Sequence, residues 1–439
     1  MKVFLVSTYE LGRQPFGLAS PAAWLAREGV DVTCLDLSRD RFTPRVADAD
    51  FVAFYLPMHT ATRLAVPVIS RIRQLNSKVV ICCYGLYAPL NDTFLRSLGV
   101  SHVLGGEFEA DLTCLVTGRT SSSSQDQLPR LEFLQPLRAK LPPLTRYATL
   151  QCGERSRVVG YTEASRGCKH TCRHCPIVPV YKGSFRVVAP DVVVADVEAQ
   201  VVAGAEHITF GDPDFFNGVG HARRVVEGVA GRCPDVTYDV TIKIEHLLDH
   251  ADLLPLLRDT GCLFVTSAFE SFDDKILRRL GKGHTRNEIE RAVQLCRESD
   301  IPLIPTFVPF TPWTTRTDYQ QFLSEIDRLE LIDHVAPIQL AIRLLVTSGS
   351  RLLELDELAP FLQSYDGQKL LYPWQNADPK MDELAKGIEK IVGERLNVCR
   401  RDIFKVVWER AHDGKAQLVR RSQVKTRVNV PYLNEPWFC

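Results

Sequence analysis

Short apolar runs alternate with helical patterns through the first part of the chain, residues 1–125. The runs are rich in Val, Ile and Phe and occupy residues 2–6, 30–35, 50–56 and 78–82, and residues 103–107 have the pattern of a last short strand. Between them, residues 18–27 and 61–75 repeat apolar side chains at helical spacing. Strands that alternate with helices predict a Rossmann-like, doubly wound α/β sheet. Ligands of such sheets bind at the carboxyl ends of the strands.

A second series of strand and helix patterns fills residues 151–375. Six apolar runs predict strands at residues 158–161, 207–210, 236–242, 263–267, 302–308 and 336–345. Helices are expected at residues 190–203, at 247–260 and after Thr285, which begins a Thr-x-x-Glu capping box. Six βα units predict a partial (βα)6 barrel, whose active site lies at the carboxyl ends of its strands.

The remaining segments are shorter. The Thr-Ser-Gln-Asp run at residues 120–127 is too polar to bury a core and marks the domain boundary. We expect residues 126–150 to be a linker that packs across the second domain. Residues 376–439 are predicted to form a helical extension, with amphipathic helices at 381–396 and 402–412.

Composition and charge limit the cellular compartment and the classes of partner that the sequence predicts. Formal net charge is zero, so no nucleic-acid partner is expected. The first residues are too short an apolar run for a signal peptide, and no 18-residue apolar segment predicts a membrane span. Thirteen cysteines in 439 residues lack the density of a disulfide scaffold. The sequence therefore predicts a cytoplasmic protein in a reducing compartment.

Three cysteines at residues 168, 172 and 175 form the most informative motif. Cys168, Cys172 and Cys175 have the spacing C-x3-C-x2-C, and one short loop can present all three thiolates to a cubane iron–sulfur cluster. Cubanes normally take four cysteines, so three would leave one iron open for another ligand. The alternatives are three unrelated cysteines, or a zinc site completed by His170 or His174.

This spacing resembles the radical S-adenosylmethionine (SAM) superfamily, in which the open iron of a [4Fe–4S] cluster chelates the methionine part of SAM. The resemblance implies that the cluster and SAM are cofactors, and that a flavodoxin or ferredoxin supplies electrons. It also suggests roles for polar residues just past the predicted strands, each of which could instead be a solvated loop residue. Asp212 or Asp214 would accept from the SAM amino group, Lys243 and Glu245 would contact the ribose or carboxylate, Glu270 and Ser271 would act similarly, and His174 would stack on the adenine.

The first domain resembles the cobalamin-binding-type domain that precedes many radical SAM cores. The histidine motif D-x-H-x-x-G that ligates cobalt is missing after the first strand, and His59 follows the third strand instead. We therefore expect a vestigial domain or one adapted to another ligand, with cobalamin bound without a protein histidine as the alternative.

The last residues, Glu-Pro-Trp-Phe-Cys, resemble the radical SAM group named for its Cys-Sec-Ala-Glu-Pro or Cys-Cys-Ala-Glu-Pro tail. Residues 57–60 and 307–313 also resemble that group, and the chain is similar to the radical SAM enzymes of arsinothricin biosynthesis. The resemblance implies transfer of a 3-amino-3-carboxypropyl group from SAM to trivalent arsenic. Cys439, with Cys399, would then hold arsenite, because thiolates bind soft ions; the alternative is an idle terminal cysteine. Whether a selenocysteine follows Cys439 is left open.

Other functions stay open at this stage. The chain could be a cobalamin-dependent radical methyltransferase or a radical SAM enzyme for another small molecule. It could also be a binding protein that a zinc ion or cluster stabilises.

Overall fold

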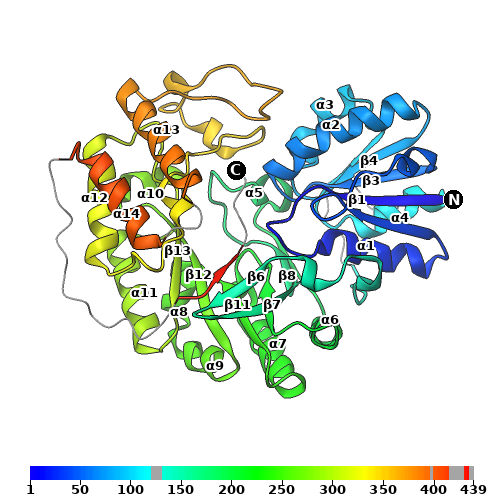
Figure 1. Ribbon diagram of the computed structural model, residues 1–439, viewed down its shortest axis with the longest axis horizontal. Helices are drawn as coiled ribbons and strands as arrows, with labels where there is room; N and C mark the ends of the chain where they lie inside the picture. Colours follow the sequence, from blue (N-terminus) through cyan, green and yellow to red (C-terminus); the bar gives the residue numbers. More distant parts are fainter. Residues whose placement is uncertain (120–130, 396–398, 415–429, 435–439) are drawn as a thin grey trace.

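The computed structural model describes residues 1–119, 131–395, 399–414 and 430–434. Two sheets dominate it (Figure 1): the first lies at the right of the view, and the second lies below and to the left of the centre. Among the described residues, no helix combines the length and the apolar character that a bilayer span requires.

The first sheet is parallel throughout, with strand order β2-β1-β3-β4-β5. Side chains of β3 alternate between its faces, because Phe51 and Ala53 join the apolar cluster under α1 and α4, whereas Val52 and Phe54 join the cluster under α2 and α3. Both faces are therefore buried, as the predicted doubly wound sheet requires. The elements are β1 Lys2–Ser7, α1 Phe16–Arg27, β2 Asp31–Asp36, β3 Phe51–Tyr55, α2 His59–Leu75, β4 Val80–Tyr84, α3 Asp92–Ser97, β5 His102–Leu104 and α4 Glu109–Thr117.

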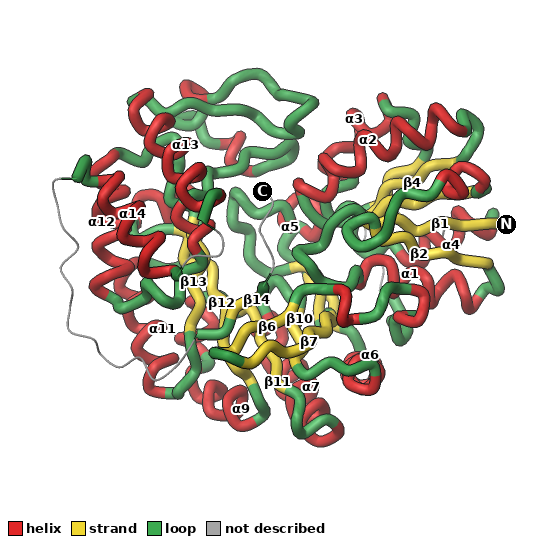
Figure 2. Tube along the Cα trace, viewed as in Figure 1, coloured by secondary structure: helices red, strands yellow, loops and turns green. Residues whose placement is uncertain are grey.

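The second sheet is curled, and its five parallel strands follow the order β13-β12-β11-β10-β7 (Figure 2). Helices pack on its outer face over one large apolar core. This is the half-barrel that the βα repeats predict. Its parallel strands are β7 Arg155–Thr162, β10 His207–Phe210, β11 Thr237–Thr241, β12 Cys262–Glu270 and β13 Leu303–Phe307, and its helices are α6 Pro190–Val202, α7 Val219–Arg232, α8 Ile244–Asp249, α9 Leu254–Asp259, α10 Asp274–Leu280, α11 Arg286–Glu298 and α12 Arg316–Arg328.

Two predicted elements of the barrel are wrong. Residues 336–345 are not a strand, because Pro337 begins a short 3-10 helix, Pro337–Leu340. In place of a sixth strand, a single parallel bridge joins Phe310 and Arg343. The amide oxygen of Gln339 accepts from the backbone N–H of Phe307, so a side chain replaces the missing strand at the end of β13. The helix expected at residues 247–260 is interrupted at His250, and α9 begins again with Pro255 in its first turn.

The sequence also predicts the C-terminal helices, which are α13 Pro379–Gly393 and α14 Arg400–Ala411. It does not predict two antiparallel strands at the β7 edge of the sheet. Strand β6, Thr149–Cys152, pairs with β7, and β14, Tyr432–Leu433, pairs with β6. Since both pairings are antiparallel, β14 runs in the same direction as β7. The tail of the chain thus returns to the barrel.

The described part of the predicted linker, residues 131–148, packs between the two sheets. The Arg138 guanidinium pairs with Asp196 on α6 and donates to Gln14 in the first unit and to the carbonyl of Tyr161 on β7. The backbone N–H of Leu137 donates to the Ala19 carbonyl on α1. The segment therefore connects both units through hydrogen bonds.

Candidate active site at the carboxyl edge of the barrel

The cysteine motif follows directly from β7. A short hairpin, β8 Ser165–Gly167 with β9 Phe185–Val187, encloses the loop and helix α5, Ile177–Tyr181. Gly167 has φ +76°, and a Cβ there would overlap the ring of Tyr181, so only glycine fits this turn. The Asn217 side chain accepts from the backbone N–H of Lys169 at 3.2 Å and donates to the Gly167 carbonyl at 3.3 Å. The loop is therefore held at its start by a residue that follows β10.

Two buried lysines face the three thiols. Lys243 Nζ lies 3.9 Å from Cys172 Sγ. Burial acts to lower the pKa of Lys282, but Glu270 and the thiols of Cys172 and Cys175 together raise it. Burial raises the pKa of Cys175 to about 12 and also raises that of Cys168. Iron is bound by the thiolate, so cluster binding removes these protons. The two ammonium groups compensate the resulting negative charge, and the residues present fit a cubane cluster with three protein ligands.

Asp212 and Asp214, both after β10, have different environments. Asp212 accepts from the backbone N–H of Ala164 at 2.9 Å and from the Ser165 hydroxyl at 2.5 Å, and burial raises its pKa to about 7. Both of its oxygens are thus used to shape the turn between β7 and β8. Asp214 is fully buried and meets His170 and His246. The structure therefore separates two carboxylates that the sequence treats as equivalent.

Lys243 and Glu245 follow β11 and form an ion pair. Lys243 Nζ lies 2.7 Å from Glu245 Oε2. Burial acts to raise the pKa of Glu245, but the hydrogen bond and charge of Lys243 outweigh it and lower the pKa. The ammonium of Lys243 thus lies between the Glu245 carboxylate and the Cys172 thiol, which links the end of β11 to the cysteine loop.

Glu270, at the end of β12, is buried and has φ +64°, a left-handed conformation that a glutamate rarely adopts. Its Oε1 lies 3.0 Å from His174 Nε2 and 3.4 Å from Lys282 Nζ. Burial acts to raise its pKa, but Lys282 and His174 together hold the pKa at about 2. His174 is therefore tied to the barrel by an ion pair. The Ser271 hydroxyl accepts from the backbone N–H of Asp273 at 3.0 Å.

The structure brings together the ends of β7, β10, β11 and β12, as predicted, and adds residues that the sequence analysis did not propose for this site. Nothing in the sequence apart from the residue type indicated that His246 or Lys282 belongs to the site, although His246 directly follows Glu245. His170 lies within the cysteine motif itself, but its Nε2 points to Asp214 and His246. Cys439 lies outside the described residues, as do residues 120–130.

Arg166, two residues before Cys168, is the other residue that sequence reasoning missed. Its guanidinium is buried and pairs with Glu163, with Glu109 at 2.6 Å and with Glu107 at 3.3 Å. Burial acts to lower its pKa, but the three carboxylates hold it well above the usual value. Because Glu107 and Glu109 follow β5, this network joins the first sheet directly to the cysteine loop.

Aromatic rings fill the carboxyl edge of the first sheet. Tyr55, Tyr84 and Phe108 are buried with ring centroids 4.8 to 6.0 Å apart, and Gly17 lies directly against the Tyr55 ring. His59 Nε2 contacts the carbonyl of Lys369 at 2.7 Å. His59 begins α2, and no histidine occurs among the described residues between β1 and β2, so the residues present do not fit a cobalt ligated by an imidazole there.

Residues 162–326 match the model of the radical SAM superfamily. Together with the half-barrel and the three thiols, the match defines a radical SAM domain, the catalytic domain of enzymes that use a [4Fe–4S] cluster and SAM.

Particular relatives lie within that class. A Methanocaldococcus jannaschii protein named as a methylthiotransferase is 22% identical over 62% of this chain and 63% of its own length. The ribosomal protein uS12 methylthiotransferase RimO of Syntrophotalea carbinolica is 24% identical over 38% of each chain. The alignments thus span less than two thirds of these relatives.

Two solved structures share the fold. The cobalamin-dependent SAM radical enzyme OxsB, with aqua-cobalamin and SAM bound, has a TM-score of 0.68 at 13% identity, over 94% of this chain and 72% of that chain. The radical SAM methyltransferase TsrM of Kitasatospora setae, with cobalamin and a [4Fe–4S] cluster, has a TM-score of 0.55 at 18% identity, over 75% and 73%. At these identities the likeness shows the fold alone, and that fold includes the N-terminal sheet.

Proposed function

We propose that this protein binds a [4Fe–4S] cluster through Cys168, Cys172 and Cys175 and cleaves SAM reductively. The observation that supports this most directly is the position of the three thiols on one loop at the carboxyl edge of the barrel, with Lys243 against Cys172. A reduced cluster of this kind supplies the electron that breaks a carbon–sulfur bond of bound SAM.

The chain's own residues bind and orient SAM in this proposal. Glu245 is partly exposed and follows a strand end, so its carboxylate is the acceptor that best suits the SAM amino group. Lys243 would keep that carboxylate charged and directed toward the cysteine loop. Asp212 acts indirectly, by holding the turn before the loop. Glu270, with Lys282, fixes His174 beside Cys175.

The substrate we propose is trivalent arsenic, with Cys439 as its holder. Strand β14 supports this, because it runs parallel to β7 toward the cysteine loop and ends at Leu433, six residues before Cys439. Six residues reach at most about 20 Å. In the proposed step, the bond between sulfur and the methionine side-chain carbon of SAM breaks and 5′-methylthioadenosine leaves. A carbon–arsenic bond forms, and arsenite loses one of its oxygen ligands as hydroxide. Two electrons from a flavodoxin or ferredoxin keep the arsenic trivalent.

Product analysis tests this proposal. Reconstituted protein is incubated anaerobically with SAM, a reductant and arsenite, and the products are separated by mass spectrometry. The proposal predicts 5′-methylthioadenosine and a 3-amino-3-carboxypropyl arsenical, and it predicts that Cys439→Ser loses the arsenical while cluster iron is kept. Formation of 5′-deoxyadenosine with no arsenic–carbon product would exclude arsenic transfer but leave SAM cleavage intact.

A cobalamin-dependent methyl transfer is the second candidate function. It is favoured by the fold that the chain shares with OxsB over 94% of its length. The aromatic cluster at the edge of the first sheet opposes it. Reconstitution with hydroxocobalamin followed by gel filtration distinguishes the two candidate functions. Corrinoid absorption bands that elute with the protein would favour methyl transfer, and the absence of such bands would exclude it.

A further inference from the structure

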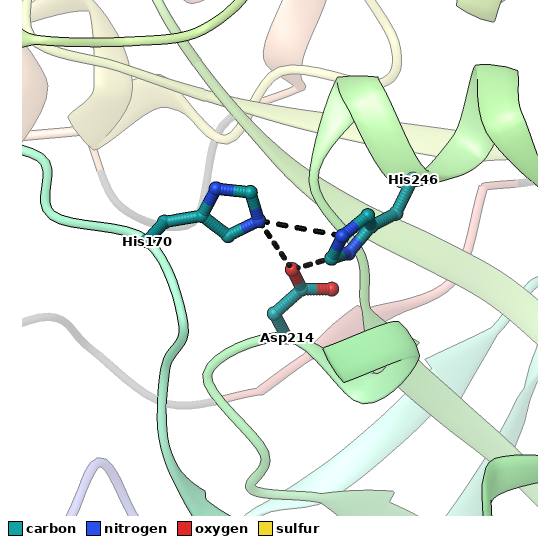
Figure 3. Close-up of side chains that lie close together, drawn as sticks. All are labelled: His170, Asp214 and His246. Atoms are coloured by element: carbon teal, nitrogen blue, oxygen red, sulfur yellow. Dashed lines mark hydrogen bonds and ion pairs between the residues drawn. The ribbon is translucent and has the colours of Figure 1, made fainter. Parts of the chain in front are cut away.

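Three potential metal ligands meet beside the cysteine loop: His170 from the loop itself, Asp214 after β10, and His246 on α8 (Figure 3). Asp214 and His246 are buried, and His170 is partly exposed. The Nε2 atoms of the two histidines lie 3.4 Å apart, and His170 Nε2 lies 3.6 Å from Asp214 Oδ2. Two donors on one tetrahedral zinc ion lie roughly 3.3 Å apart, since zinc–ligand bonds are about 2.0 to 2.1 Å. With one ligand atom from each side chain, the three atoms lie within 4.8 Å of one another, so small side-chain shifts would bring them to a shared cation.

Hydrogen bonds within the protein do not account for this group. Asp214 Oδ2 and His246 Nδ1 lie 2.7 Å apart, yet among the described residues neither atom has a hydrogen bond of acceptable geometry. Buried polar atoms are normally satisfied, and an unsatisfied carboxylate oxygen is costly. A cation bound by Asp214 Oδ2 and by one nitrogen of each imidazole would satisfy the buried oxygen.

The surrounding groups orient the three side chains toward one point. Asp214 Oδ1 accepts from the backbone N–H groups of Phe216 at 3.3 Å and of Lys243 at 3.4 Å, which leaves Oδ2 to face the histidines. Glu245 Oε1 lies 4.0 Å from His170 Nδ1, on the side of the ring away from Asp214. At this ion-pair distance the Glu245 carboxylate adds negative charge next to the site, which favours a bound cation.

We propose that His170, Asp214 and His246 bind one divalent transition-metal ion, separate from the iron–sulfur cluster. Two imidazoles with one carboxylate select zinc or ferrous iron over magnesium or calcium, which prefer oxygen ligands. Three protein ligands leave at least one coordination position open. The ion would therefore offer a binding point for a donor atom of the substrate at the carboxyl edge of the barrel. This assignment makes Asp214 a metal ligand instead of a contact of the SAM amino group.

Zinc content measured beside iron content tests the proposal. Reconstituted protein with its cluster is incubated with one equivalent of zinc sulfate and desalted, and both metals are quantified. We expect about one zinc and about four irons per chain. Zinc in His246→Ala and in His170→Ala should fall roughly tenfold or more while iron is unchanged. His170 is partly exposed, so its replacement tests the site even if the buried His246 variant does not fold.

A matched control and a spectroscopic measurement complete the test. His250 ends the same helix, with its ring centroid 6.1 Å from that of His246, and His250→Ala should keep its zinc. Zinc-edge X-ray absorption should show nitrogen and oxygen ligands at about 2.0 to 2.1 Å. Sulfur ligands at about 2.3 Å would place the zinc on the cysteines and overturn the proposal. Wild-type protein that keeps no zinc, or a His170→Ala variant that keeps all of it, would also overturn it.

Discussion

Buried charge is concentrated in a few residues around the cysteine loop. Glu270 is a clear example, because its carboxylate lies within 3.4 Å of both His174 and Lys282 and has its pKa held at about 2. A carboxyl whose pKa is lower in the folded state than in the unfolded state stabilises the fold above its unfolded pKa. That contribution is lost as the pH falls from about 4.5 through about 2.

Glu270→Gln should remove this pH dependence. Between pH 5 and pH 3, the wild-type free energy of unfolding should fall by about 2 kcal/mol more than that of the variant. Urea titrations of cluster-free protein at each pH would measure this difference in the free energy of unfolding, because no iron can then be released by acid. Glu389→Gln, on the exposed face of α13, should keep the wild-type slope. Parallel slopes for wild type and Glu270→Gln would contradict the ion-pair assignment.

At this scale, the sequence predicts that the cysteine loop and the polar residues past the strands lie at one edge of the barrel. It misses His246 and Lys282, and it does not predict which residues contact each other. Three thiols and the polar residues past the strands follow from spacing and from strand periodicity. The different roles of Asp212 and Asp214 depend on partners far along the chain, Ser165 and His246. Such pairings arise from tertiary packing, and periodicity carries no information about them.

Among the elements, α1 packs unusually closely on the first sheet. Gly17 allows this approach, because a Cβ at that position would overlap the Tyr55 ring, and its carbonyl accepts from the Tyr84 hydroxyl at 2.7 Å. A small residue at this point therefore determines how closely α1 packs on the sheet.

Gly17→Ala should destabilise the protein by about 1 to 3 kcal/mol through overpacking. The matched control is Gly231→Ala on α7, where an added Cβ meets nothing within 4 Å. Alanine there should be neutral or should stabilise the helix by up to about 1 kcal/mol. Chemical denaturation of both variants would check the pair, and equal effects would contradict the close packing of α1.

The sequence predicts the elements best where strand or helix periodicity is strong. The first sheet, α6 and α11 all form as expected. The prediction fails at residues 336–345, where apolar content suggested a strand but Pro337 and the Gln339 side chain produce a 3-10 turn. It also misses β6, which has four residues, and β14, which has two, because strands this short have too few positions to show a clear alternation.

In the whole molecule, one arginine links the two sheets. Arg166 precedes the cysteine loop and pairs with Glu163 and with Glu107 and Glu109 of the first unit. Its guanidinium also lies over the ring of Phe108, 5.2 Å from the centroid. Removing this charge leaves three carboxylates without their shared partner, so the first unit and the cysteine loop are energetically coupled.

Arg166→Met should therefore destabilise the protein by about 3 to 5 kcal/mol. Arg166→Lys should recover only part of this, since an ammonium cannot reproduce the guanidinium geometry. Thermal and urea unfolding would measure both variants. Arg155→Ala, which breaks an exposed ion pair with Glu206, should cost no more than about 1 kcal/mol. Equal losses for Arg166→Met and Arg155→Ala would contradict the proposed coupling.

The account as a whole depends on a cluster held by three thiolates with one iron left for SAM. Electron paramagnetic resonance of the reduced, anaerobically reconstituted protein tests this most directly. We predict a cubane signal that changes when SAM is added and that is lost in Cys172→Ala. A protein with Cys168, Cys172 and Cys175 intact that shows no cubane signal, or a signal that SAM leaves unchanged, would contradict the account.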